Sequence, residues 1–421
     1  MRPSVPALPP ALHTALAPFR FLFHADTWPV FLCVLTGLLT GHTTLACVRA
    51  SLLTAGVKWH QCCDFYRRAR WSRTAFLRAT TALVLQALYP DGLPARLWWV
   101  ADTTSSDKPS AKQVFGIRRF WRGCRRPGQA PTHQGHGWVL LAHLHQRPDR
   151  SWQALLVGAL LWLQLRRASP ARLTAVLVAQ LGLPSPVTHV VVSDRGLSSR
   201  ALVRALRARG CHSVTRLRRN TVVYTPAPPP ATPRRGHPRK YGDKYRLDAL
   251  DRALLTPTAV TVWVDQRWQA ATAWRGTFWR KGLPEPVVLV IVETARRAPW
   301  YLQATDPRLT TEEIVAGYHG RHAIEPAIQQ ANALGLNRYH GRTARGVRRW
   351  PLPLCLAHSL LALMALGALS LDLPELGWPW YPREDSAGQV RRRLLAALAR
   401  AGIFVPEGGL GQPPPQIRRT A

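Results

Sequence analysis

Residues 1 to about 90 place hydrophobic side chains at the spacing of amphipathic and buried helices. The pattern predicts helical segments at about 30–39, 43–55, 58–70 and 72–88. The third segment mixes Trp59, Phe65 and Tyr66 with arginines. Short helices with such a basic, aromatic third member are compatible with a helix-turn-helix reader of DNA. An ordinary helical bundle with a basic surface explains the pattern equally well, and both interpretations stay open here.

From about residue 96 the hydrophobic positions form short runs that are typical of buried strands, and these runs alternate with helical segments. Strands are predicted at 97–101, 114–120, 138–145, 188–193 and 213–219, and helices at 171–181 and 199–209. A strand-rich start followed by strand–helix alternation is the pattern of a sheet flanked by helices. The fold class predicted for this part of the chain is therefore α/β.

Residues 220–300 interrupt this alternation. A loop rich in proline and arginine, TPAPPPATPRRGHPRK, cannot form the core of a helix or a sheet. Three predicted strands follow it, at 259–264, 268–274 and 287–292, and tryptophans are concentrated there. We interpret this region as a β-rich insertion into the α/β domain.

Helical patterning returns at Thr310, which is spaced to form a capping box with Glu313. An uncharged stretch at 351–371 is long enough to cross a bilayer, but it opens with Pro-Leu-Pro and contains His358. A helix buried in a large core is the favoured interpretation. One further amphipathic helix is predicted near 386–402.

The chain carries 57 Lys and Arg against 22 Asp and Glu, which gives a formal charge of +35 over 421 residues. Charges of one sign repel each other unless a polyanion neutralises them, so this balance points to nucleic acid. At 47% hydrophobic residues the chain is too apolar to be disordered. Basic segments at 118–126 and 234–244 supply candidates for phosphate contacts, namely Arg118, Arg119, Arg239, Lys240 and Lys244.

The seven cysteines are scattered, form no Cys-x-x-Cys pair and have no zinc-like spacing with histidine. Such a set is typical of a reduced, cytosolic protein without a disulfide framework. The N-terminal residues lack the uninterrupted apolar core of a signal peptide. We therefore predict a cytoplasmic protein without membrane association.

Two aspartates share one setting. Asp102 and Asp194 each end an apolar run and precede small polar residues. The carboxyl ends of strands open onto the crevice in which α/β sheets bind ligands. Two carboxylates there indicate a site for Mg²⁺ or Mn²⁺, which prefer oxygen ligands. For either residue alone, the alternative is a role in capping a turn.

A third acid, Glu325, belongs to the helical segment after Thr310. Tyr318, Arg321 and Glu325 are spaced three and four residues apart, which places them on one helical face. The alternatives are a surface ion pair between Arg321 and Glu325 and a packed aromatic ring at Tyr318. Pro326 directly follows Glu325 and predicts a kink in the helix there.

Three motifs, in this order along the chain, resemble those of the DDE transposases of bacterial cut-and-paste insertion sequences. They are Ala-Asp-Thr-Thr at 101–104, Val-Val-Ser-Asp-Arg-Gly at 191–196 and Tyr-x2-Arg-x3-Glu at 318–325. The resemblance extends from about residue 20 to about residue 370, and it includes a β-rich insert between the second acid and the helix with the third.

The resemblance implies a ribonuclease-H-like catalytic domain in which Asp102, Asp194 and Glu325 hold two Mg²⁺ (or Mn²⁺) ions. It also implies that Tyr318 and Arg321 contact DNA near the transposon end. The implied activity is metal-dependent strand cleavage and strand transfer. The implied partners are double-stranded DNA with terminal inverted repeats, target DNA and a second copy of the chain, and the implied location is the bacterial cytoplasm, at the nucleoid.

The family often has a lysine seven positions after the glutamate, where this chain has Asn332. Asn332 and Pro326 leave open a catalytically inactive or domesticated relative that binds DNA without cutting it. The domains implied are a helical DNA-binding domain (1–92), a catalytic domain in two parts (93–220 and 306–372), a β-rich insertion (221–305) and a C-terminal helix and tail (373–421).

Overall fold

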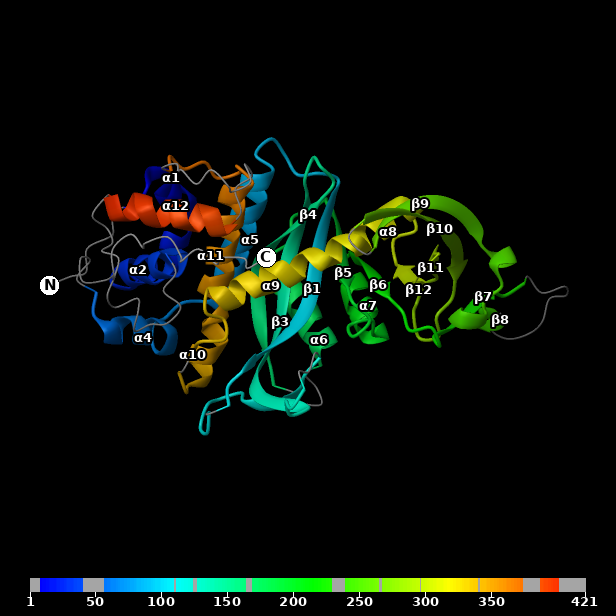
Figure 1. Cartoon of the computed structure of the whole chain (residues 1–421), viewed down its shortest axis with the longest axis horizontal. Coiled ribbons are helices and arrows are strands. Elements are labelled where there is room, and N and C mark those ends of the chain that lie inside the picture. Colours follow the sequence, from blue (N-terminus) through cyan, green and yellow to red (C-terminus); the bar gives the residue numbers. More distant parts are fainter. Residues whose placement is uncertain are drawn as a thin grey trace, which may run out of the picture. The chain divides into compact units, whose positions relative to one another are not determined.

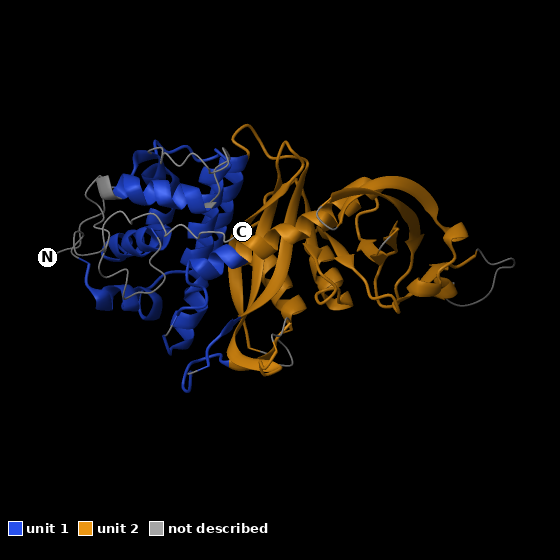
Figure 2. Ribbon diagram, in the orientation of Figure 1, with its two compact units in different colours: residues 1–88, 106–117, 329–421 blue, residues 89–105, 118–328 orange. Residues whose placement is uncertain are grey.

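The computed structural model of the chain describes residues 8–40, 57–109, 111–123, 127–163, 169–228, 239–264, 267–295, 297–339, 341–373 and 387–400. The helix predicted at 43–55 lies outside these residues. The chain divides into two compact units, one made of residues 1–88, 106–117 and 329–421 and the other of residues 89–105 and 118–328 (Figure 2). Each unit is described by itself below.

The first unit is helical and has one apolar helix at its centre. Its helices are α1 (Pro10–Leu16), α2 (Thr27–Thr40), α4 (Trp59–Arg67), α5 (Arg73–Leu88), α10 (Ala344–Arg349), α11 (Pro351–Ala365) and α12 (Ala387–Arg400). Helix α11 packs against α2, α5 and α12, and its residues from Pro351 to Met364 are all buried. The prediction of a buried helix in this stretch is therefore confirmed. No helix in the described part of the chain has the length and hydropathy that a bilayer crossing requires.

Two of the three aromatic side chains named for the third N-terminal segment belong to this helical core, whereas Trp59 is 45% exposed. Phe65 and Tyr66 of α4 are 1% and 0% exposed. The ring of Phe65 stacks on that of Trp71 with 5.3 Å between centroids. Arg349 closes the cluster, because its guanidinium lies 4.3 Å from the Trp71 ring and donates hydrogen bonds to the carbonyls of Ala69 and Trp71. Phe65 and Tyr66 therefore pack inside the unit.

The second unit is built on a large mixed sheet (Figure 1). Its strands are β1 (Arg96–Asp107), β2 (Arg118–Trp121), β3 (Thr132–Gln146), β4 (Trp152–Trp162), β5 (Thr188–Ser193), β6 (Cys211–Arg216), β9 (Thr256–Val264), β10 (Arg267–Phe278), β11 (Val287–Thr294) and β12 (Arg297–Ala304). The order across the sheet is β2-β3-β1-β5-β6-β12-β11-β10-β9, with β4 paired to β3. Strand β5 runs parallel to both β1 and β6, whereas β3 and β4 are antiparallel.

Helices connect and flank this sheet. They are α6 (Pro170–Gln180), α7 (Arg200–Arg207), α8 (Thr311–Gly320) and α9 (Ile324–Ala333), with a short 3-10 turn at Arg321–Ala323. Ser169 and Ser199 cap α6 and α7 by accepting the amide hydrogens of Arg172 and Leu202. The predicted fold class, a mixed α/β sheet flanked by helices and accompanied by N-terminal helices, is confirmed.

The β-rich region predicted after residue 220 is present, and most of its strands extend the main sheet. Strands β9 to β12 pair in series, and β12 pairs with β6. A separate hairpin of β7 (Val222–Pro226) and β8 (Tyr241–Arg246) packs over them through a core that includes Val223, Leu247 and Phe278. The domain boundaries given above stay predictions.

Helix α8 approaches the sheet closely because two of its residues are glycines. A Cβ atom on Gly317 would overlap the ring of Trp98, and one on Gly320 would lie 2.7 Å from the ring of Trp152. The two rings contact each other edge to face, with 6.3 Å between centroids. Bulk on this helical face would therefore push α8 away from β1 and β4.

We expect Gly317→Ala to lower the free energy of unfolding by about 1–3 kcal/mol, because overpacking a tight contact forces the backbone apart. The opposite effect, the higher helix propensity of alanine, amounts to about 1 kcal/mol or less. Urea denaturation measures the difference. Gly123→Ala is the control, because a Cβ atom there meets no atom within 4 Å. A Gly317→Ala protein as stable as the wild type would contradict the close approach.

Candidate active site

Asp102 lies on β1, and Asp194 directly follows β5, the parallel strand beside it. The register pairs Ala101 of β1 with Ser193 of β5, so the two aspartates follow directly after paired residues. Strand β1 does not end at Asp102, as its apolar run predicted, but continues to Asp107. The half-buried residues from 102 to 105 keep the extended conformation after the apolar run has ended. Asp102 is therefore a side chain of the strand itself, and only Asp194 lies beyond a strand end.

The carboxylate of Asp102 is largely buried and has two donors. Its Oδ1 atom accepts a hydrogen bond from the Thr103 amide at 2.7 Å, and its Oδ2 atom accepts one from Arg321 Nη1 at 3.3 Å. Burial raises the pKa of Asp102 to about 6, and the negative charges of Asp194 and Glu325 act in the same direction. The Thr103 amide and the Arg321 guanidinium lower this pKa but do not outweigh burial. Both other acids are thus electrostatic neighbours of Asp102.

Asp194 caps the turn that follows β5. Its Oδ1 atom accepts the amide hydrogens of Gly196 at 2.8 Å and Leu197 at 3.2 Å. The turn-capping role that the sequence left open is therefore present, and it uses one carboxylate oxygen. The side chain is half-buried at the edge of the sheet.

Glu325 lies in the first turn of α9, directly after the 3-10 turn that follows α8. The kink predicted at Pro326 is not in the helix after Glu325, since the irregular segment precedes it, at Arg321–Ala323. Pro326 occupies the first turn of α9, where a missing amide hydrogen costs least. Tyr318, Arg321 and Glu325 thus belong to three consecutive helical segments and not to one regular helix.

Arg321 joins two of the three acids. Its Nη1 atom donates to Asp102 and its Nη2 atom donates to Glu325 Oε1 at 3.1 Å. The arginine side chain is only 11% exposed, whereas that of Glu325 is 53% exposed. The ion pair with Glu325 that the sequence offered as an alternative is present, together with a second one to Asp102 that the spacing did not indicate.

His322 is a neighbour of Glu325 that the sequence analysis did not select. Its Nδ1 atom lies 3.2 Å from Glu325 Oε1 and 3.2 Å from Arg321 Nη2. Burial and the Arg321 charge lower the pKa of His322, although Glu325 opposes them. The neutral imidazole can therefore accept or donate a hydrogen bond at this point. Its position three residues before Glu325 could have identified it.

Tyr318 is buried, with 4% of its surface exposed. Its ring lies 6.3 Å from that of Trp300, and the Arg321 guanidinium carbon lies 6.0 Å from the Tyr318 ring centre. The packed aromatic ring that the sequence allowed is present here, and the ring supports the position of Arg321.

The basic candidates form two groups at a distance from the acids in the fold. Arg118 and Arg119 lie exposed on β2, and the Arg118 Nε atom donates to the Leu163 carbonyl. The second group surrounds the β7–β8 hairpin: Arg239 donates to the Tyr241 carbonyl, Lys240 lies 4.2 Å from the Trp279 ring, and Lys244 is exposed on β8.

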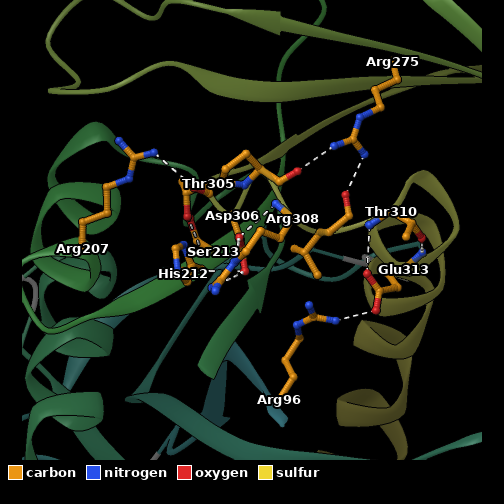
Figure 3. Close-up of polar contacts among 12 residues, drawn as sticks. Arg96, Arg207, His212, Ser213, Arg275, Thr305, Asp306, Arg308, Thr310 and Glu313 are labelled. Carbon is orange, nitrogen blue, oxygen red and sulfur yellow. Dashed lines mark hydrogen bonds and ion pairs between the residues drawn. The ribbon is translucent and has the colours of Figure 1, made fainter. Parts of the chain in front are cut away.

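A polar network fixes the start of α8 (Figure 3). Thr310 and Glu313 form the predicted capping box. Glu313 also pairs with Arg96 at the start of β1, the strand that carries Asp102. Arg275 of β10 donates to the carbonyls of Pro307 and Leu309 just before the helix. The helix that leads to Arg321 is thereby tied to two strands of the sheet.

Three carboxylates fit the donor chemistry of Mg²⁺ or Mn²⁺. In this structure, however, the Arg321 guanidinium engages two of them. Within the described residues, no three His, Cys, Asp or Glu side chains are grouped closely enough to enclose a metal ion. Arg321 would therefore compete with a metal ion for Asp102 Oδ2 and Glu325 Oε1.

The chain belongs to the DDE superfamily of endonucleases, because the model of that family matches residues 19–286. The resemblance to DDE transposases is thereby confirmed at the level of the family. Asp102 and Asp194 lie inside the matched range, and Glu325 lies beyond it.

No curated protein matches the chain. Among solved structures, it is similar to a piggyBac transposase synaptic complex with hairpin DNA, determined by cryo-electron microscopy, with a TM-score of 0.39 and 10% sequence identity. That similarity covers 89% of this chain and 72% of the other.

Proposed function

We propose that this protein is a transposase that catalyses metal-dependent DNA strand cleavage and strand transfer at the ends of its element. The observation that carries the proposal is the placement of Asp102 on β1 and of Asp194 directly after the adjoining parallel strand β5, with Glu325 linked to Asp102 through Arg321. Membership of the DDE endonuclease family and the charge of +35 support it. The partners proposed are double-stranded DNA with terminal inverted repeats, target DNA and a second copy of the chain in the DNA complex.

Asp102, Asp194 and Glu325 would hold the two Mg²⁺ or Mn²⁺ ions. When bound, the ions would activate water or a 3′-hydroxyl and stabilise the leaving oxygen. The three acids differ in which oxygen atoms are available to a metal ion. Oδ1 of Asp194 already accepts a hydrogen bond from the turn that follows β5, whereas the side chain of Glu325 is half exposed to solvent. Arg321, once released from a carboxylate, is close enough to the acids to bind the DNA backbone beside the scissile phosphate.

A second function has a specific observation in its favour. Arg321 forms ion pairs with two of the acids in this structure, and Asn332 stands where the family often has lysine. A protein in which this arrangement is permanent would bind DNA without cutting it. The two functions differ in whether the protein cleaves DNA, which can be measured.

Nicking of a supercoiled plasmid separates them. The plasmid carries the inverted repeats that flank the gene, and the full chain is incubated with it with Mg²⁺ or with EDTA. We expect nicked and linear products with Mg²⁺ only. Retardation of the plasmid without any nicking, in Mg²⁺ and in Mn²⁺, would instead support the DNA-binding protein without chemistry.

Binding is expected to depend steeply on salt, because phosphate contacts release counterions. If five or more phosphates are neutralised, the logarithm of the association constant falls with the logarithm of the salt concentration at a slope of roughly −5 or steeper. Fluorescence anisotropy of a labelled duplex between 50 and about 300 mM KCl measures the slope. A nearly flat response would show that the charge of +35 is not used to bind nucleic acid.

A further inference from the structure

Strand β2 forms one edge of the large sheet and has only four residues. It pairs with residues 132–135 of β3, whereas β4 pairs with β3 from residue 137 onward. The partner of β3 thus changes within a few residues. The β2 segment and the start of β3 form a short two-stranded ribbon at this edge.

Side chains alternate between the two faces of this ribbon. Phe120 is 5% exposed, and its ring lies 5.5 Å from that of Trp162 and 5.9 Å from that of His133. Since Phe120 points inward, its neighbours Arg119 and Trp121 share the opposite face. Trp121 is 78% exposed. The residues paired with Trp121 and Arg119 across the ribbon are Thr132 and Gln134, so the outward face is polar except for one indole ring.

The ribbon lies in a long segment of positive charge. Residues 108–148 contain no Asp or Glu, while Arg118, Arg119 and Arg122 surround Trp121 in sequence. An indole ring of this size exposed to water forgoes the free energy of burial that tryptophan normally gains. A flat ring that is surrounded by cationic and hydrogen-bonding side chains is suited to a ligand that is anionic and has aromatic faces. Nucleic acid has both properties, since its phosphates are charged and its bases stack.

We infer that the outward face of the β2 ribbon is a DNA contact in which Trp121 stacks on a base while Arg119 binds a nearby phosphate. The inference rests on the proposed function, and it adds a base contact outside the acid site. Phosphate contacts position a protein on DNA, whereas an exposed ring recognises an unstacked base regardless of sequence. The ribbon therefore holds DNA at a point where a base is accessible or becomes unstacked.

Binding constants measured against salt concentration test the two side chains separately. Loss of a base stack is expected to weaken binding by about 5- to 150-fold without changing the salt slope, because no counterion is involved. Trp121→Ala and Trp121→Leu should both show this loss, while Trp121→Phe keeps most of the affinity because it keeps a ring. Arg119→Gln should weaken binding and also reduce the steepness of the slope by about 1. Leu254→Ala removes another exposed apolar side chain, 43% exposed, and should leave the binding constant unchanged.

The outcomes are distinguishable from failure of the proposed function. Wild-type protein that neither binds nor nicks the plasmid would overturn both proposals. Wild-type protein that binds and nicks, with Trp121→Ala equal to Leu254→Ala in affinity, would overturn the base stack alone. A change of sedimentation coefficient in Trp121→Ala without DNA would assign the ring to a contact between copies of the chain and overturn the DNA contact. Because Trp121 is 78% exposed, the Trp121 variants should keep the melting temperature of the wild type.

Discussion

Replacing Asp102, Asp194 or Glu325 by alanine is expected to abolish strand cleavage and to leave DNA binding intact. Each change removes carboxylate oxygens that a divalent cation needs, and metal ions contribute several kcal/mol to such reactions. At 1.36 kcal/mol for each tenfold change, the nicking rate should fall by roughly three orders of magnitude or more. Binding should persist because the predicted phosphate contacts, Arg118 and Lys244 among them, lie elsewhere in the fold.

Isosteric variants distinguish a loss of cleavage from a loss of the folded structure. Asp102→Asn, Asp194→Asn and Glu325→Gln preserve size, and Asp102→Asn also removes the cost of burying a charge. Glu312→Ala is the control, because Glu312 is an exposed acid in the first turn of α8. Cleavage is measured on the supercoiled plasmid, and binding by anisotropy with EDTA present. An amide variant that nicks at the wild-type rate would exclude that residue from the metal site.

The sequence predicted that Asp102 and Asp194 lie close together, because the ends of buried strands can be recognised from the ends of apolar runs. Two buried apolar runs with similar endings place their next residues at the same edge when the strands are parallel neighbours, as β1 and β5 are. The exact end of β1 was not visible, because Thr103 and Ser105 extend the strand without hydrophobic alternation. Strand β4 was missed for a related reason: WQALLVGALLW is a continuous apolar run, which resembles a buried helix as much as a strand.

Only one of the two ion-pair contacts of Arg321 could be predicted from local sequence spacing. Its pairing with Glu325 follows from a spacing of four residues, but its hydrogen bond to Asp102 spans 219 positions. That contact depends on how closely α8 packs on the sheet, which Gly317 and Gly320 permit because they carry no Cβ atom to overlap the rings of Trp98 and Trp152. The burial of Arg321 follows from the same packing. It is a largely buried side chain, and not the surface arginine that the helical spacing suggested.

Arg321→Ala is expected to lower the cleavage rate by at least about tenfold, because a charge-assisted clamp on the scissile phosphate is lost. Arg321→Lys should restore only part of the rate, since a point charge does not replace a bidentate fork. The rate is measured on the plasmid with saturating Mg²⁺. An Arg321→Ala protein with full activity would assign the arginine to the structure of the acid cluster alone.

The same variant should respond more strongly to metal than the wild type does. In the wild type, Arg321 forms ion pairs with both Asp102 and Glu325 and would compete with a cation for them. Without it, the carboxylates repel each other, so the metal-free variant should melt at a lower temperature, since removing one partner of a largely buried ion pair is destabilising. Mg²⁺ should then raise its melting temperature more than that of the wild type, because a ligand stabilises the folded state according to its affinity. Arg321→Ala combined with Glu325→Gln should lose much of this Mg²⁺ response. Equal responses in wild type and Arg321→Ala would mean that the cation does not bind where the guanidinium lies.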